Sequence, residues 1–143
     1  MTKVSSSDLA KAAEMLRNAH DTHVPCKALH DFIDADDIEA GYAIQNINTD
    51  HWVKQGRRLV GRKTGLTAKS VQKQLGVDQP DFGMLYADMA YAGGEDVPLS
   101  KLMQPKIEGE IAFVLKDDLD QEQLTITDIT RAIDYAVAAI EIV

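Results

Sequence analysis

The chain has 143 residues, of which 45% are hydrophobic and 27% charged, ordinary values for a globular domain that argue against intrinsic disorder. Its net charge of −8 makes it a poor general binder of nucleic acid, although residues 57–77 hold six basic side chains and no acidic one. No apolar run approaches the roughly 20 residues that span a bilayer, no signal-peptide core opens the chain, and the single cysteine, Cys26, fits the reducing cytoplasm.

Two helices are predicted in the first third of the chain. Residues 7–20 repeat apolar side chains at the i, i+3, i+4 and i+7 spacing of an amphipathic helix, and Ser7 can cap the first turn. Residues 38–55 show a second helical pattern, with Asp36 or Asp37 as its cap and a glycine at its end. The chain therefore begins with a helical region.

A segment punctuated by glycine and proline comes next. Residues 57–66 indicate a strand that enters a tight turn, and Thr67 is placed to cap a short helix over 68–75. Residues 82–89 form a second predicted strand. Residues 93–105 hold two glycines and two prolines, so we expect them to be mostly turn.

The clearest strand of the chain is predicted at residues 106–116, where β-branched and aromatic residues alternate sides. A helix capped by Thr127 is expected through about Val137, and residues 138–143 begin another strand. Helices come first and strands later, which predicts an α+β fold rather than a regular βαβ array. Because the last strand ends the sequence without a turn or cap, we expect the chain to be the front part of a longer protein.

Acidic residues occupy one face of two predicted strands. Successive side chains of a strand point to opposite faces, so Glu108 and Glu110 share a face, about 6.6 Å apart along the strand. Glu141 likewise interrupts an apolar strand. Carboxylates that are partly buried together repel each other and lose hydration, and a divalent cation such as Mg²⁺ or Mn²⁺ relieves both costs. The opposite face of the first strand is expected to pack into a core through Ile107, Ile111, Phe113 and Leu115.

Simpler interpretations of these acids stay open at this point. Glu108 and Glu110 can lie on a solvated face, as exposed strand acids usually do, and spacing alone favours neither reading. For Glu141 taken alone, an ion pair with a buried Arg or Lys is the better interpretation than a metal.

Lys63 and Asp81 are the other candidate site residues, and both have ordinary alternatives. Lys63 lies in a glycine-rich turn, where the backbone can approach a ligand closely, but most loop lysines are simply solvated. Asp81 follows Pro80, a position where Asp commonly caps a turn. The basic segment that contains Lys63 suits a small anionic substrate.

Four runs of the sequence, in this order and spacing, resemble one enzyme family: GRKTGLT at 61–67, QLGVDQPDFG at 74–83, PKIEGEIAFVL at 105–115 and AAIEIV at 138–143. They are similar to the 2-oxopent-4-enoate hydratases, also called 2-hydroxypenta-2,4-dienoate hydratases, of the fumarylacetoacetate hydrolase superfamily. The resemblance runs from about residue 38 to the last residue. Members of this family are considerably longer, so the chain matches their N-terminal part.

The resemblance implies an α+β fold in which N-terminal helices precede the first part of a mixed β-roll of the fumarylacetoacetate hydrolase type. It implies an N-terminal helical region at 1–56. Residues 57–143 would then be the first part of the catalytic mixed-β domain, truncated at its C-terminal end.

Site residues follow from the same resemblance. It maps the metal ligands onto Glu108, Glu110 and Glu141, with magnesium or manganese as the family metal. It maps the active-site lysine and aspartate of the family onto Lys63 and Asp81. Further pocket residues are expected beyond residue 143.

The resemblance implies a hydro-lyase that adds water to 2-hydroxypenta-2,4-dienoate and gives 4-hydroxy-2-oxopentanoate, in the meta-cleavage catabolism of aromatic compounds. Arg62 looks most like the residue that the five-carbon hydratases carry at this position. Three alternatives remain: a 4-oxalocrotonate-type decarboxylase, a hydrolase of acylpyruvate carbon–carbon bonds, and a non-catalytic fragment or binding module. The family is usually oligomeric, so the expected partners are a small dienol or keto acid and further copies of the chain, without nucleic acid or membrane.

Overall fold

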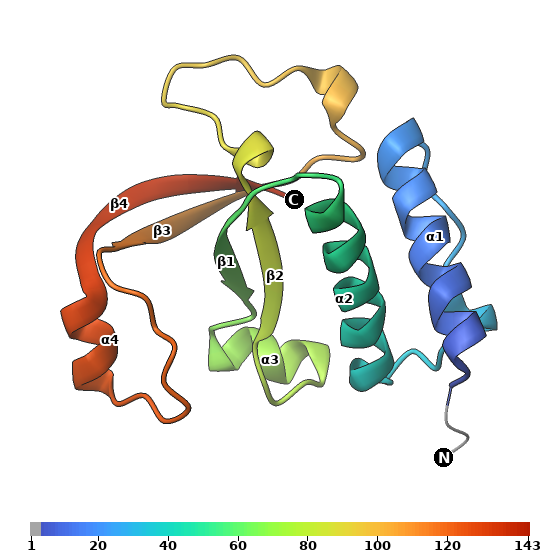
Figure 1. The fold of residues 1–143 in the computed structure, drawn as a ribbon, viewed down its shortest axis with the longest axis horizontal. Helices are drawn as coiled ribbons and strands as arrows, with labels where there is room; N and C mark the ends of the chain where they lie inside the picture. Colours follow the sequence, from blue (N-terminus) through green and yellow to red (C-terminus); the bar gives the residue numbers. More distant parts are fainter. Residues whose placement is uncertain (1–3) are drawn as a thin grey trace. The chain divides into compact units, whose positions relative to one another are not determined.

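The computed structural model describes residues 4–143, so the first three residues of the predicted N-terminal helical region lie outside the described residues. Helices and antiparallel strands alternate irregularly along the chain (Figure 1), which confirms the predicted α+β class. The structure divides between Met103 and Gln104 into two compact units.

Two long helices open the first unit. α1 spans Ser6–Thr22 and α2 spans Ile38–Lys54, in agreement with the two predicted helices to within two residues at each end. The cap of α1 is Ser5 rather than Ser7, because the Ser5 side chain accepts a hydrogen bond from the backbone of Asp8. No helix in residues 4–143 is long and apolar enough to cross a membrane.

The packing of α1 against α2 (Figure 1) makes the small core of the first unit. Ala12 and Ala13 of α1 are fully buried against Ile44 of α2, since two alanines allow close approach of the helix axes. Asn48 is buried in the same contact and accepts a hydrogen bond of 2.6 Å from Arg17. Partly buried side chains complete the cluster: Leu9, Leu29, Phe32, Ile33 and Ile47.

A two-stranded antiparallel sheet follows the helices. β1 spans Leu59–Gly65, α3 spans Lys69–Leu75 and β2 spans Asp81–Tyr86. Both strands and the short helix between them were predicted, and Gly76 ends α3 in the left-handed conformation. The predicted cap Thr67 is wrong, because α3 begins after Ala68 without a side-chain cap. Three short 3-10 helices occupy Leu29–Asp31, Ala87–Met89 and Leu99–Lys101.

The second unit is a long antiparallel hairpin with one short helix. β3 spans Ile107–Leu115 and pairs with β4, which spans Ile133–Ile142; α4 spans Ile126–Ala132. The predicted cap Thr127 and helix end near Val137 are wrong. Thr125 caps α4 instead, through a reciprocal capping box with Asp128, and the run of β-branched and aromatic residues from Ile133 onward is strand.

The predicted core face of β3 is exposed in this structure. Ile107, Ile111 and Phe113 are 74%, 67% and 58% exposed, and Ile140 of β4 on the same face is 69% exposed. The strand alternation was predicted correctly, but within residues 4–143 no layer buries this apolar face.

Candidate functional site

Lys63 and Asp81 lie on the same face of the β1–β2 sheet. In the strand register Lys63 pairs with Gly83, and Gly65 pairs with Asp81, so each charged residue has a glycine as its cross-strand partner. The Lys63 Nζ lies 3.7 Å from the Asp81 Oδ1, an ion-pair distance. The side chains are 34% and 51% exposed, so water screens the attraction and the pair adds little stability. The structure thus brings together the two residues that the resemblance maps onto the active site.

The strand that carries Asp81 is held from its outer edge by α2. The Gln45 side-chain amide donates a hydrogen bond of 2.9 Å to the carbonyl of Phe82, and the Phe82 amide donates one of 3.1 Å to the Tyr42 hydroxyl. Tyr42 and Gln45 are three residues apart and therefore share a helix face. Sequence reasoning missed both, because a hydrogen bond from a helix to a distant strand leaves no local pattern.

The end of β1 is fixed by a buried glutamine. Leu66 follows Gly65 and has a φ of 56°, a left-handed conformation that is unusual for a leucine. Gln72, which is 3% exposed, donates a hydrogen bond of 2.6 Å to the carbonyl of Leu66 and accepts one from Lys69. This contact ties the turn after Gly65 to α3 and so determines where β1 ends.

Arg57 joins the helices to the sheet just before β1. Its guanidinium lies 5.0 Å from the centre of the Trp52 ring and 4.2 Å from that of Tyr86, and it donates two hydrogen bonds to the carboxylate of Asp88. The hydrogen bond from Arg57 lowers the pKa of Asp88 below its usual value of 3.8. Sequence analysis counted Arg57 in the basic segment and missed this structural role.

The three predicted metal ligands lie together in the second unit. Glu108 of β3 is the direct cross-strand partner of Glu141 of β4, and Glu110 follows two residues later on the same face. One carboxylate oxygen from each residue lies within 4.8 Å of the others. Glu108 and Glu110 are exposed and Glu141 is half-buried. Among residues 4–143 this is the only group of three or more potential metal-binding side chains.

The donor set of this cluster fits a hard divalent cation. All three donors are carboxylate oxygens, which Mg²⁺, Mn²⁺ and Ca²⁺ prefer. Like charges directly opposite each other destabilise a strand pair, whereas a cation between them would remove the repulsion. Exposed acids also occur without any ion, so the geometry permits a metal site and does not require one.

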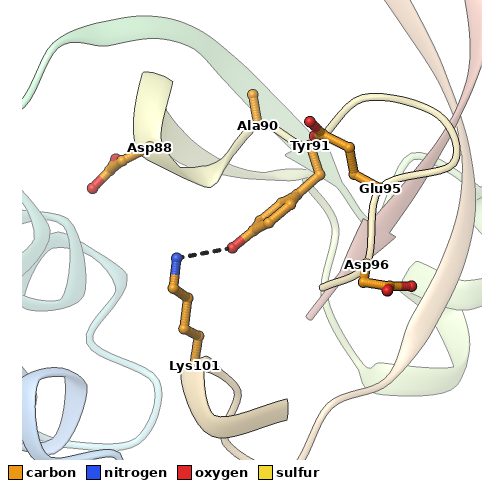
Figure 2. A pocket seen from close by; sticks show the side chains of 6 residues that line it. All are labelled: Asp88, Ala90, Tyr91, Glu95, Asp96 and Lys101. Carbon is orange, nitrogen blue, oxygen red and sulfur yellow. Dashed lines mark hydrogen bonds between the residues drawn. The ribbon is translucent and has the colours of Figure 1, made fainter. Parts of the chain in front are cut away.

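A pocket in the first unit lies elsewhere (Figure 2). It has a volume of about 460 Å³, and the Lys101 ammonium donates a hydrogen bond of 3.4 Å to the Tyr91 hydroxyl at its edge. None of the predicted site residues lines it. Its lining is mostly polar: Asp88, Ala90, Tyr91, Glu95, Asp96 and Lys101.

Arg62 lies on the opposite face of β1 from Lys63, because neighbouring strand residues point to opposite sides. It is exposed, and its guanidinium donates a hydrogen bond of 3.2 Å to the carbonyl of Gly61. The structure gives no contact through which Arg62 would select a substrate.

Comparison with known sequences finds enzymes of one kind. The chain is 55% identical over 133 residues to a TodF product hydratase of Pseudomonas putida strain F1, which covers 93% of the chain and 50% of that protein. It is 50% identical over 143 residues to 2-keto-4-pentenoate hydratase 1 of Dechloromonas aromatica, covering all of the chain and 54% of that protein. The chain thus spans about half the length of the curated relatives it matches. No family model matches the sequence.

Comparison with solved structures finds a related fold. A 4-oxalocrotonate decarboxylase from Pseudomonas putida G7, in complex with magnesium and adipate, superimposes on the chain with a TM-score of 0.84 at 28% identity. The match covers 98% of the chain and 53% of the decarboxylase. The same enzyme in complex with calcium and acetate superimposes equally well. The match confirms the predicted fold, the N-terminal part of the fumarylacetoacetate hydrolase type.

Proposed function

We propose a function for this chain from the premise that it belongs to the family of 2-keto-4-pentenoate hydratases. The chain would supply part of a hydro-lyase that adds water to 2-hydroxypenta-2,4-dienoate and gives 4-hydroxy-2-oxopentanoate. The observation that carries this proposal is an identity of 50–55% to hydratases over at least 92% of the chain. The five proposed site residues all lie in 57–143, which supports treating this part as the start of the catalytic region.

Glu108, Glu110 and Glu141 would hold a divalent cation, Mg²⁺ or Mn²⁺. Two observations support this role: the close approach of their three carboxylates, and the magnesium and calcium with which the superimposed decarboxylase is in complex. When bound, such a cation supplies Lewis acidity to the carboxylate and the 2-oxygen of a dienol acid.

Lys63 would act on the anionic substrate, with Asp81 holding the ammonium in place. The reaction moves a proton from the 2-hydroxyl to C5, which gives a conjugated ketone, and then adds water across C4 and C3. The Lys63 Nζ can stabilise the developing negative charge on the oxygen or carry one of these protons. The ion pair with the Asp81 Oδ1 at 3.7 Å supports this division of roles.

The partners, cellular location and oligomeric state of the protein belong to the same proposal. The net charge of −8 argues against nucleic acid as a partner, whereas the basic segment at 57–77 favours a small anionic substrate that is recognised locally. We place the enzyme in the cytoplasm as a homo-oligomer of the meta-cleavage pathway. The exposed apolar face of β3 and β4 is consistent with association.

Decarboxylation is the second candidate function, because the solved structure that superimposes on the chain is a decarboxylase. The intact enzyme separates the two in ¹⁸O-labelled water. A hydratase incorporates ¹⁸O into the C4 hydroxyl of the product from 2-hydroxypenta-2,4-dienoate. Release of carbon dioxide from 4-oxalocrotonate, without hydration of the dienoate, would replace the hydratase proposal by the decarboxylase.

A further inference from the structure

We infer that Gly65 and Gly83 are positioning residues. Neither has a side chain, and this leaves the space above the β1–β2 sheet in which Lys63 and Asp81 form their ion pair. The inference deepens the proposed function and rests on it, since it assigns the two glycines to the Lys63–Asp81 pair. The register places a glycine opposite each charged residue, in a diagonal arrangement on one sheet face.

The backbone gives no reason for glycine at these two positions. Glycine weakens a strand because it loses more conformational freedom than other residues and has no side chain to pack. The glycines with a positive φ among the described residues are Gly56, Gly76 and Gly94, so neither Gly65 nor Gly83 adopts a conformation that excludes alanine. What distinguishes these two positions is that other side chains fill the space above them.

The space above Gly83 is filled by the stem of Lys63. A Cβ at position 83 would lie 3.0 Å from the Lys63 Cε and 3.1 Å from its Cγ, tighter than most Cβ contacts in proteins. The contact involves the root of the side chain as well as its far end. An alanine would therefore displace the stem by a few tenths of an ångström and shift the ammonium that meets Asp81.

The space above Gly65 is filled by the other partner. A Cβ at position 65 would overlap the Asp81 Oδ1 and would lie 3.2 Å from the Asp81 Cγ and 3.3 Å from the Lys63 Nζ. Asp81 has only two side-chain torsions, so its carboxylate would have to rotate out of the ion pair. Each glycine thus protects one end of the same contact.

Gly61 supplies a matched control on the same strand and the same face. A Cβ there would lie 3.7 Å from the Leu85 Cδ1, an ordinary van der Waals contact. Gly61→Ala, Gly65→Ala and Gly83→Ala therefore add the same methyl group to one sheet face, and only the last two meet the charged pair.

The test measures kcat, KM and metal affinity of these variants in the intact enzyme, together with thermal unfolding. We expect kcat to fall at least about tenfold for Gly65→Ala and Gly83→Ala, because a misplacement of about 1 Å can cost 100-fold in rate. Gly61→Ala should stay within about twofold of wild type, and Mn²⁺ affinity should not change in any of the three. Unchanged kcat in Gly65→Ala and Gly83→Ala would overturn the inference.

A double-mutant cycle separates positioning from general damage to the sheet. In the Lys63→Ala background the stem is gone, so adding Gly83→Ala should cause no further loss of kcat; Gly65→Ala should likewise cause none in the Asp81→Ala background. Additive losses in both cycles would overturn the inference even if the single variants are slow. A Gly83→Ala protein that folds only when Lys63 is also replaced would support it.

A different result is expected if the proposed catalytic roles of Lys63 and Asp81 are wrong. If Lys63→Ala and Asp81→Ala keep wild-type turnover, the roles assigned to these residues are wrong. Crystal structures of Gly65→Ala and Gly83→Ala then decide the positioning inference by itself. An Nζ–Oδ1 distance that grows beyond 4.0 Å supports it, and an unchanged distance overturns it.

Discussion

The two antiparallel sheets carry their charged side chains in opposite ways. In β1–β2 the facing charges are of opposite sign, and glycines leave room for them to meet at 3.7 Å. In β3–β4 three charges of the same sign lie together, with Glu108 directly across from Glu141. The first arrangement pairs opposite charges within the chain, whereas the second would gain stability from a cation bound between its carboxylates. The first sheet is therefore expected to be preorganised, and the second to depend on its ligand.

The largest effect is expected in the second sheet. Replacing Glu108 or Glu110 by Gln removes the charge of a proposed metal ligand. It should weaken Mn²⁺ binding to the intact enzyme more than about 100-fold, because the loss of a residue that only supports a ligand typically costs 10–100-fold. Isothermal titration calorimetry measures this directly. Asp134→Asn is the matched control, since Asp134 is an exposed acid of β4 outside the cluster. Near-normal titration of both Gln variants would remove the metal assignment.

In the metal-free protein the same substitution should stabilise the fold instead of weakening a function. Without a cation, Glu108→Gln relieves repulsion across the strand pair and should raise the free energy of unfolding by about 0.2–1 kcal/mol. Urea unfolding of this variant should show a higher free energy of unfolding than wild type without Mn²⁺ and a lower one with Mn²⁺. A loss of stability in both conditions would mean that Glu108 serves the fold rather than a cation.

An intermediate effect is expected in the first sheet. Lys63→Ala should lower kcat about 100-fold, the lower end of what a positioned acid or base contributes, and should leave metal affinity nearly unchanged. Paired kinetics and metal titration on one preparation measure both quantities. Equal losses of turnover and metal binding would mean that Lys63 supports the structure and does not take part in the reaction. The contrast between the two sheets would then be weaker.

The smallest effect concerns the contact of Arg57 with Asp88 beside the first sheet. Because the folded protein holds the pKa of Asp88 below 3.8, the stabilisation is complete above the pKa of the unfolded chain and is lost as the pH falls through the lowered pKa. The Asp88 side chain is 60% exposed, so we expect less than about 1 kcal/mol. Wild type and Asp88→Asn should differ in urea unfolding at pH 5 and converge toward pH 3; a difference independent of pH would contradict the ionic origin.

The sequence predicted elements whose cause is local and missed those that depend on distant partners. The alternation of residues 107–115 was enough to place Glu108 and Glu110 on one face. The register that sets Glu141 opposite Glu108 is a long-range property, because a shift of one residue would turn Glu141 to the other face. The metal role of these residues and the catalytic role of Lys63 and Asp81 stay predictions.

The misses have identifiable physical causes. Thr125 and Thr127 are both good caps, and only the hydrogen bonds with Asp128 decide between them. The apolar face of β3 was predicted as core because hydrophobicity indicates what a residue can bury, not whether a covering layer is present. The stacking of Arg57 on Trp52 and Tyr86 joins a loop to α2 and β2 and has no sequence pattern.

Trp52 is the single tryptophan of the chain, and it lies in the first unit between His20, Arg57 and Tyr86. Its fluorescence is therefore a native reporter of the junction of α1, α2 and the first sheet. The emission would change when Arg57 leaves the ring, with no added label. Unfolding confined to β3, α4 and β4 would leave that signal largely unchanged, so comparing tryptophan emission with far-ultraviolet circular dichroism would resolve the two units in one melting experiment.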